Sequence, residues 1–203
     1  MPLRAPLLIV LIAIALAASS ARAGEFNPKL NVGDPAPAWK NLPGVAIKQH
    51  SLADLKDAPL VLVVFTCNSC DVATSYEDRI IAFAKKHKPE VAVVAINVST
   101  KPADALPRMR ERAEEKKFPY PYLFDKSQES GKAYGANFTP EFFLLDADRK
   151  IAYMGSLDDN GDPDKVELNY VEQAVAAKKK GTAPAIVETP PRGCRIRYPR
   201  ERR

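Results

Sequence analysis

Two cysteines separated by two residues are the side chains best suited to chemistry in this sequence. Cys67 and Cys70 flank Asn68 and Ser69, a spacing that lets the two sulfurs cycle between a dithiol and a disulfide. A continuous apolar run at 60–65 precedes the pair, and helical periodicity follows it. The free N–H groups and dipole of the helix N-terminus are expected to lower a thiol pKa there. The pattern predicts redox chemistry, with Cys67 as the attacking thiol and Cys70 as the more buried, resolving thiol.

Three other interpretations of the pair remain open. A structural disulfide between Cys67 and Cys70 is one of them, and a Cu(I) site that uses both thiolates is the second. A zinc site is the third, but it needs a second pair of ligands, for which only Cys194, His50 and His87 remain. Redox chemistry of the pair is the preferred interpretation, and on that interpretation we predict no metal and no cofactor.

A Thr-Pro dipeptide about 70 residues after the first cysteine is the second feature of chemical interest. Thr139 and Pro140 lead into an apolar run, Glu141-Phe142-Phe143-Leu144-Leu145. A cis peptide bond at Pro140 would place the backbone of Thr139 against the dithiol, where it could bind an extended substrate chain. The alternative is an ordinary trans proline at the start of a strand.

The first 23 residues have the pattern of an export signal. Arg4 precedes an apolar stretch at 7–18, and Ala21-Arg22-Ala23 forms an A-x-A cleavage site. Twelve apolar residues are too few to span a bilayer, which takes about 20. We expect cleavage after Ala23 and a periplasmic or secreted protein with no stable membrane insertion; the alternative is a signal that is retained as an uncleaved anchor.

The remaining chain is long enough for one domain at 24–180, followed by an extended, basic, proline-rich tail at 181–203. Loss of Arg4 and Arg22 with the signal would lower the formal charge from +5 to +3, too little to indicate nucleic-acid binding. Cys194 lies in the tail and leaves an odd cysteine to explain. It is a candidate third redox thiol if the tail folds back over the dithiol, and otherwise a packed or free thiol.

Periodicity and turn residues predict alternating strands and helices. Two buried strands with a helix between them imply a right-handed crossover and a parallel sheet. Strands are expected at 60–65, 91–98 and 122–124, and a hairpin is expected from 141–146 and 151–155. One helix of about 17 residues should follow Cys70, and further helices are expected at 103–117, 125–134 and 166–180.

These features together resemble the thioredoxin-like redoxins, a family that includes thioredoxins, their exported thiol–disulfide relatives and the peroxiredoxin-like proteins. The segment Phe65-Thr66-Cys67-Asn68-Ser69-Cys70 with Tyr76-Glu77-Asp78-Arg79, and the ending Gly193-Cys194-Arg195-Ile196, are similar to an exported, peroxiredoxin-like branch of the alkyl hydroperoxide reductase and thiol-specific antioxidant superfamily. The resemblance implies an α/β thioredoxin-like fold, with a central mixed β-sheet flanked by helices.

The resemblance also implies an enzyme that exchanges disulfides with protein thiols and with an unidentified electron donor or acceptor. Peroxide reduction by the same thiols is the alternative within the family, and Cu(I) binding is the non-enzymatic one. Two departures bear on the choice. Thioredoxin's Trp-Cys-Gly-Pro-Cys is absent, and the peroxiredoxin pattern Pro-x-x-x-Thr-x-x-Cys is not met, because Thr66 lies four residues before Cys70 and the proline is missing.

Overall fold

The computed structural model describes residues 24–199, and a five-stranded mixed β-sheet lies at its centre. The strand order is β5-β4-β3-β7-β8, with β3, β4 and β5 parallel to one another and β7 and β8 antiparallel to their neighbours. The strands are β3 (Leu60–Phe65), β4 (Val91–Asn97), β5 (Tyr122–Phe124), β7 (Glu141–Leu145) and β8 (Ile151–Gly155). The predicted signal segment at 1–23 lies outside the described residues, as do residues 200–203.

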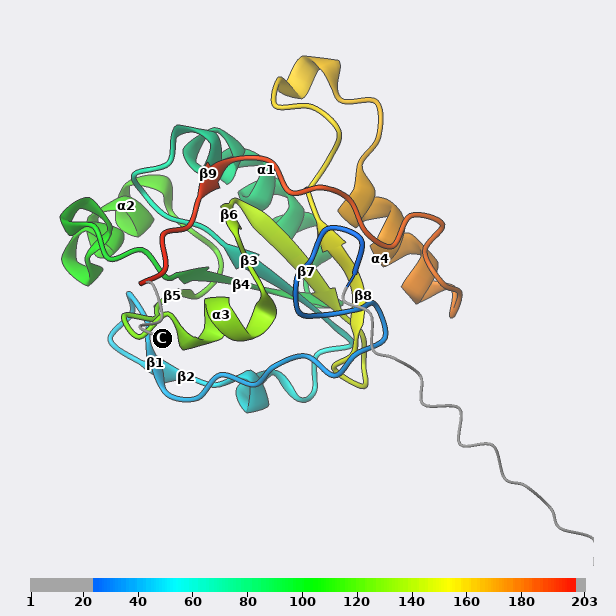
Figure 1. The fold of residues 1–203 in the computed structure, drawn as a ribbon, viewed down its shortest axis with the longest axis horizontal. Helices are drawn as coiled ribbons and strands as arrows, with labels where there is room; N and C mark the ends of the chain where they lie inside the picture. The colour runs from blue at the N-terminus through cyan, green and yellow to red at the C-terminus, as the bar shows by residue number, and fades with distance from the viewer. Residues whose placement is uncertain (1–23, 200–203) are drawn as a thin grey trace, which may run out of the picture.

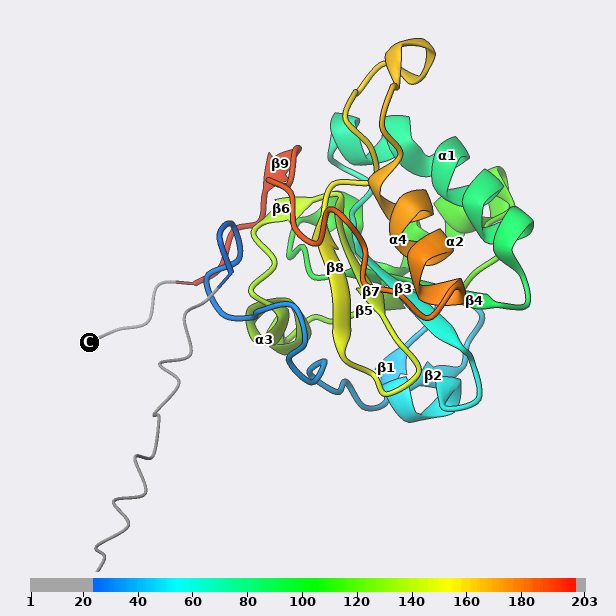
Figure 2. The ribbon, with the colours of Figure 1, turned by 90° about the vertical axis from the view of Figure 1, so that its right-hand side faces the viewer.

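Helices cover both faces of the sheet, as the sequence predicted (Figures 1 and 2). The helices are α1 (Asp71–His87), α2 (Leu106–Lys116), α3 (Glu129–Tyr134) and α4 (Tyr170–Lys179). Two small sheets pair β1 (Leu42–Pro43) with β2 (Gln49–His50), and β6 (Phe138–Thr139) with β9 (Cys194–Arg195). No helix of residues 24–199 is both long and apolar enough to cross a membrane.

Alternate residues of β3 point to opposite faces, and each face has its own apolar cluster. Leu62 and Val64 pack with side chains of α1, α2 and α4, whereas Val63 and Phe65 pack with α3 and the N-terminal segment. All six residues of β3 are buried, which is why its sequence is a continuous apolar run. This central strand fixes the position of the cysteine turn that follows it.

The first helix begins where the chemistry lies. Cys70 is its N-cap, and its Sγ accepts the backbone N–H of Ala73 at 3.3 Å. The helix ends at His87, because Lys88 precedes Pro89 and adopts extended backbone.

Three helices start later than the sequence predicted, and the helix expected at 103–117 begins at Leu106, after a separate 3-10 helix at Pro102–Asp104. The helix expected at 125–134 spans only α3, because the Asp125 carboxylate accepts the N–H groups of Ser127, Gln128 and Ser130 and so holds a turn ahead of the helix. The helix expected at 166–180 spans only α4.

The delay of α4 comes from a loop that pairs with Asp159 instead of continuing the helix. The Asp159 N–H donates to the carbonyl of Leu168, and its carboxylate accepts the N–H of Glu167.

The described part of the tail, 181–199, lies along the domain (Figures 1 and 2). Glu188 forms a parallel β-bridge with Met154 of the outer strand β8. The Glu188 carboxylate accepts the backbone N–H groups of residues 25–27. Farther along, the tail forms β9 against β6. The two ends of the domain are therefore tied together, and the tail passes over the end of the sheet that carries the cysteine turn.

Candidate active site

All three cysteines lie at one small cavity beyond the carboxyl end of β3. The cavity has a volume of about 80 Å³ and is lined by Cys67, Cys70, Cys194 and Thr139 together with residues 98–101 and 195–197. Chemistry-bearing residues far apart in the sequence, at the turn before α1, at β6 and in the tail, are thus brought to one place.

The cysteines are not paired as the sequence spacing suggested. Cys70 forms a disulfide with Cys194, with a Cα–Cα distance of 5.9 Å, and Cys67 is a free thiol. The tail does fold back over the cysteine turn, which is the condition that the sequence set for Cys194 to act as a third redox thiol. Residue Cys67 is 8% exposed and Cys70 is 1% exposed, so Cys67 is the more accessible of the two.

The Thr139–Pro140 peptide bond is cis, and Thr139 contacts both cysteines of the turn. The Cys67 Sγ lies 3.6 Å from Thr139 Oγ1, and the Cys70 Sγ lies 3.0 Å from the Thr139 carbonyl oxygen. Thr139 therefore lies against the cysteine turn, and its role in binding a substrate chain stays a prediction. Its backbone edge is occupied by the tail, since Thr139 pairs with Cys194 in the register of β6 and β9.

The expectation of a low pKa for Cys67 is wrong for this form of the protein. Burial raises the pKa of the Cys67 thiol, and the nearby charge of Asp104 raises it further, while hydrogen bonds with Thr139 and Ser69 offset part of the rise. The helix N-terminus does not offset this rise in the Cys67 pKa. The N–H of its first turn points at Cys70 rather than at Cys67.

A buried carboxylate that the sequence analysis missed holds the turn between the two cysteines. Asp104 is fully buried, and it accepts the N–H of Ser69 at 2.8 Å, the Ser69 hydroxyl at 2.7 Å and the Ser99 hydroxyl at 2.6 Å. Lys101 Nζ donates to the Ser69 hydroxyl at 3.2 Å. Asp104 lies 35 residues from Ser69 in a stretch without a motif, so no sequence signal indicated the contact.

The other residue of the turn is fixed from the sheet. The Tyr122 hydroxyl donates to Asn68 Oδ1 at 3.0 Å, and Asn68 Nδ2 donates to the carbonyl of Ala103 at 3.4 Å. Both residues between the cysteines are therefore held by side chains or backbone from distant segments.

Glu141 is a second buried acid that the sequence analysis did not single out. Its carboxylate accepts the N–H groups of Asn137 and Phe138 at 2.8 and 3.0 Å, so it supports the backbone of β6 from behind. Burial raises the Glu141 pKa to about 7, although these two hydrogen bonds oppose the rise. Within residues 24–199, no group of three or more His, Cys, Asp or Glu side chains is arranged to hold a metal ion.

Comparisons with known proteins agree on the type of fold. A family model described as Redoxin matches residues 31–172. A hypothetical protein from Sinorhizobium meliloti 1021 is 33% identical, with a TM-score of 0.78 over 84% of this chain and 96% of that one. An uncharacterized conserved protein from Geobacillus kaustophilus is 30% identical, with a TM-score of 0.80 over 87% and 96%.

A putative thiol:disulfide interchange protein, DsbE, from Chlorobium tepidum is 25% identical, with a TM-score of 0.56 over 73% of this chain and 98% of that one. No curated protein matches the chain. The mixed sheet with flanking helices is thioredoxin-like, as the sequence resemblance implied. The match to the family model covers most of the described domain, and the chain belongs to the redoxin family.

Proposed function

We propose that this protein is an exported thiol–disulfide oxidoreductase that exchanges disulfides with protein thiols through Cys67 and Cys70. The observation that carries the proposal is the meeting of three cysteines at one cavity beside Thr139, with one disulfide already formed and one thiol free. Membership of the redoxin family and the likeness to a putative thiol:disulfide interchange protein support a thiol redox role.

The proposed reaction has two exchange steps. The Cys67 thiolate attacks one sulfur of a partner disulfide, a mixed disulfide forms, and the first partner thiolate leaves and takes up a proton. The Cys70 thiolate then attacks the Cys67 sulfur, which releases the second partner thiol and leaves a Cys67–Cys70 disulfide. The partner gains two electrons and two protons, which the dithiol loses, and the same steps run backwards oxidise a partner dithiol.

The environments of the two thiols support these roles. Cys67 is the more accessible thiol, so it meets the partner first. Cys70 is nearly fully buried and its sulfur accepts the Ala73 N–H, an interaction that stabilises a thiolate at a helix N-terminus. Cys70 is therefore poised to resolve a mixed disulfide inside the protein, where no partner reaches it directly.

Variants that keep only one of the two turn cysteines test the roles of Cys67 and Cys70. They are made in a Cys194→Ser background, because Cys194 could otherwise resolve mixed disulfides. We expect Cys70→Ser in this background to accumulate mixed disulfides with polypeptide partners through Cys67. Cys67→Ser in the same background should trap nothing. Non-reducing electrophoresis and mass spectrometry measure both, and exchange activity that survives in each single mutant contradicts the proposal.

The same variants separate disulfide exchange from peroxide reduction. Hydrogen peroxide consumption with a saturating thiol donor should be slow beside exchange, because the proline that shields a peroxidatic thiolate is absent. Rapid turnover with Cys67 oxidised to sulfenic acid would move the protein to the peroxidase class.

The proposal of export rests on the sequence at 1–23. An A-x-A site ends that segment, so the mature chain should start at Gly24. Mass spectrometry of the protein in its native compartment measures the start, and a mature chain that retains residues 7–18 contradicts export with cleavage.

A further inference from the structure

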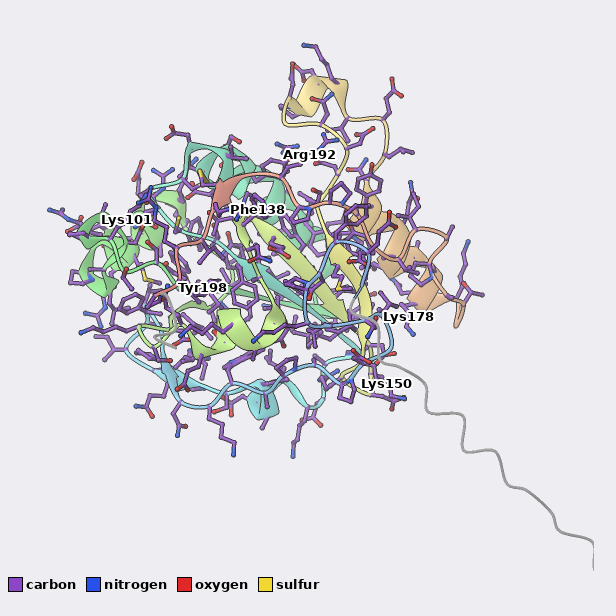
Figure 3. All side chains as sticks on the ribbon, viewed as in Figure 1. Lys101, Phe138, Lys150, Lys178, Arg192 and Tyr198 are labelled. Atoms are coloured by element: carbon purple, nitrogen blue, oxygen red, sulfur yellow. A yellow bond between two sulfur atoms is a disulfide. The ribbon has the colours of Figure 1, made fainter. Side chains whose placement is uncertain are left out.

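The end of the tail lies on the site as an added strand. Residues 193–198, called the strap from here on, cross β6 in antiparallel register, with Cys194 opposite Thr139 and Arg195 opposite Phe138. The Ile196 N–H donates to the carbonyl of Asn137 at 2.8 Å and so continues the pairing. Figure 3 labels Tyr198 near the end of the strap and Phe138 in β6, the strand with which the strap pairs.

The strap occupies the backbone edge of β6 at which a peptide would be bound. An extended partner chain that pairs with the backbone of Thr139 would add to β6 as a further strand. Cys194 sits directly opposite Thr139, and the Cys67 Sγ lies 3.6 Å from Thr139 Oγ1, so Cys194 occupies the place beside the turn through which a partner's cysteine would approach Cys67.

The strap sequence fits this edge residue by residue. Gly193 has φ +151°, and a Cβ there would collide with the carbonyl oxygen of Thr139, so no larger residue fits before the cysteine. The Arg195 guanidinium lies 5.5 Å from the centre of the Phe138 ring. The Ile196 side chain packs against the apolar cluster on one face of the sheet.

Beyond the paired residues, side chains hold the end of the strap. The Tyr198 hydroxyl donates to the carbonyl of Ala136 at 2.7 Å, and Gln128 Nε2 donates to the carbonyl of Arg197 at 3.0 Å. The strap therefore docks through contacts that do not depend on the disulfide, and the disulfide locks it in place.

From this geometry we propose that the strap is an internal substrate of the site, which closes the partner-binding edge of β6 when the disulfide moves from Cys67–Cys70 to Cys70–Cys194. The inference rests on the proposed function and adds the class of partner: an extended polypeptide whose cysteine follows a glycine. Cys194 is then a third catalytic thiol, and docking of the strap and docking of a partner exclude each other.

The step that moves the disulfide is balanced within the protein. The Cys194 thiolate attacks the Cys70 sulfur of the Cys67–Cys70 disulfide, a Cys70–Cys194 bond forms, and Cys67 leaves as a thiolate that takes up a proton. No electrons enter or leave. The open form, with the Cys67–Cys70 disulfide, and the closed form, with the Cys70–Cys194 disulfide, are therefore two disulfide isomers of the same oxidation state. In the closed form, burial and the Asp104 charge raise the pKa of Cys67 and so disfavour the thiolate that would reverse the step.

A substitution in the strap that leaves all three cysteines in place tests the inference. Gly193→Ala prevents close pairing with Thr139, and Gly181→Ala is the matched control. Gly181 also lies in the tail and has a positive φ of +72°, but a Cβ there meets nothing within 4 Å. The readouts are disulfide mapping of the fully oxidised proteins and the single-turnover oxidation of a reduced cysteine peptide, in which two peptide thiols become one disulfide-linked peptide dimer and the protein disulfide becomes two thiols.

We expect the oxidised wild type and Gly181→Ala to carry Cys70–Cys194, and Gly193→Ala to carry mainly Cys67–Cys70 with Cys194 open to alkylation. Gly193→Ala should also oxidise the peptide about tenfold faster, the factor that corresponds to ~1.4 kcal/mol of lost strap docking. Tyr198→Phe, which removes only the bond to Ala136, should move both readouts in the same direction by a smaller amount. Identical disulfide maps in Gly193→Ala, Tyr198→Phe and the control overturn the inference.

The partner class has its own probe. Two reduced peptides, one with the strap sequence Gly-Cys-Arg-Ile and one with Ala-Cys-Arg-Ile, are compared as substrates of the Gly193→Ala protein. The glycine peptide should react faster, and equal rates overturn the recognition of a glycine before the cysteine. If the proposed function itself is wrong, the result is different from equal rates. In that case no variant oxidises either peptide, whatever the disulfide map shows.

Discussion

The turn that carries Cys67 and Cys70 and the strap that carries Cys194 meet at one cavity, yet they are held by opposite means. Buried side chains hold the turn, above all the Asp104 carboxylate with its three hydrogen bonds. The strap is held by backbone pairing with β6, by hydrogen bonds of the Tyr198 and Gln128 side chains to backbone carbonyls and by one disulfide, and Cys194 itself is exposed.

The comparison indicates which of the two segments, the cysteine turn or the strap, keeps its structure when the redox state changes. A buried carboxylate with satisfied donors resists rearrangement, because any alternative leaves polar groups without partners. The strap side of the β6–β9 pairing is exposed, so water can replace its hydrogen bonds at a smaller cost. We therefore expect the turn to keep its geometry in every redox state, whereas the strap exchanges places with a partner. Four predictions sharpen or break this comparison.

The largest expected effect on stability comes from removing the Cys70–Cys194 disulfide that fixes the strap. The disulfide joins residues that are 124 positions apart, so it strongly restricts the unfolded chain. Oxidised Cys194→Ser should lose about 4 kcal/mol of unfolding free energy relative to the oxidised wild type. Urea unfolding measures this, and the reduced wild type, which lacks the same cross-link, should match the variant. A variant as stable as the oxidised wild type would show that the lock contributes nothing.

The turn should respond to the loss of its carboxylate. Asp104→Ala leaves the Ser69 N–H and the hydroxyls of Ser69 and Ser99 without their acceptor, and we expect a loss of about 3 kcal/mol. Asp104→Asn keeps an acceptor and removes the charge, so it should cost less and shift the alkylation of Cys67 to lower pH. An unchanged alkylation profile would show that the Asp104 charge does not act on Cys67.

Glu141 supports the edge on which the strap docks, and its effect depends on pH. Its pKa is about 7 in the folded protein and ordinary, near 4.5, in the unfolded chain. Between these values the folded state binds a proton that the unfolded state has lost, so stability falls as the pH rises, by up to about 1.4 kcal/mol per unit. Glu141→Gln should flatten the pH profile of urea unfolding between 4.5 and 7. A profile as steep as that of the wild type assigns the slope to other groups.

The smallest expected effect tests the other support of the turn. Tyr122→Phe removes the hydrogen bond to Asn68 Oδ1 and should cost about 1 kcal/mol in unfolding free energy. The disulfide map should stay that of the wild type, since the strap does not touch this bond. A shift toward the Cys67–Cys70 isomer would show that turn and strap are coupled and would break the comparison.

Local patterns sufficed for the framework of the site. The apolar run of β3, the start of α1 after Cys70, the Thr139–Pro140 segment and the β7–β8 hairpin each depend on neighbours in the sequence, and the structure has them where they were predicted. The late starts of α3 and α4 were missed, because side chains of Asp125 and Asp159 bind backbone groups that a helix would otherwise use.

What the sequence could not provide is contact between distant segments. The pairing of Cys70 with Cys194 depends on the path of a tail without helical or strand periodicity, and the buried role of Asp104 depends on how two loops meet. The error about the Cys67 pKa has the same origin. The helix dipole was inferred correctly, but its first turn points at Cys70, and burial dominates at Cys67.

The Cys70–Cys194 bond also has a mechanical consequence. It closes the chain into a covalent ring that contains β4 and β7, while β3 lies outside the ring and is hydrogen-bonded between those two strands. A force that pulls the two ends of the oxidised protein apart can draw β3 out of the sheet, but it cannot lengthen the ring. Roughly 400 Å of contour length stays hidden until the bond is reduced.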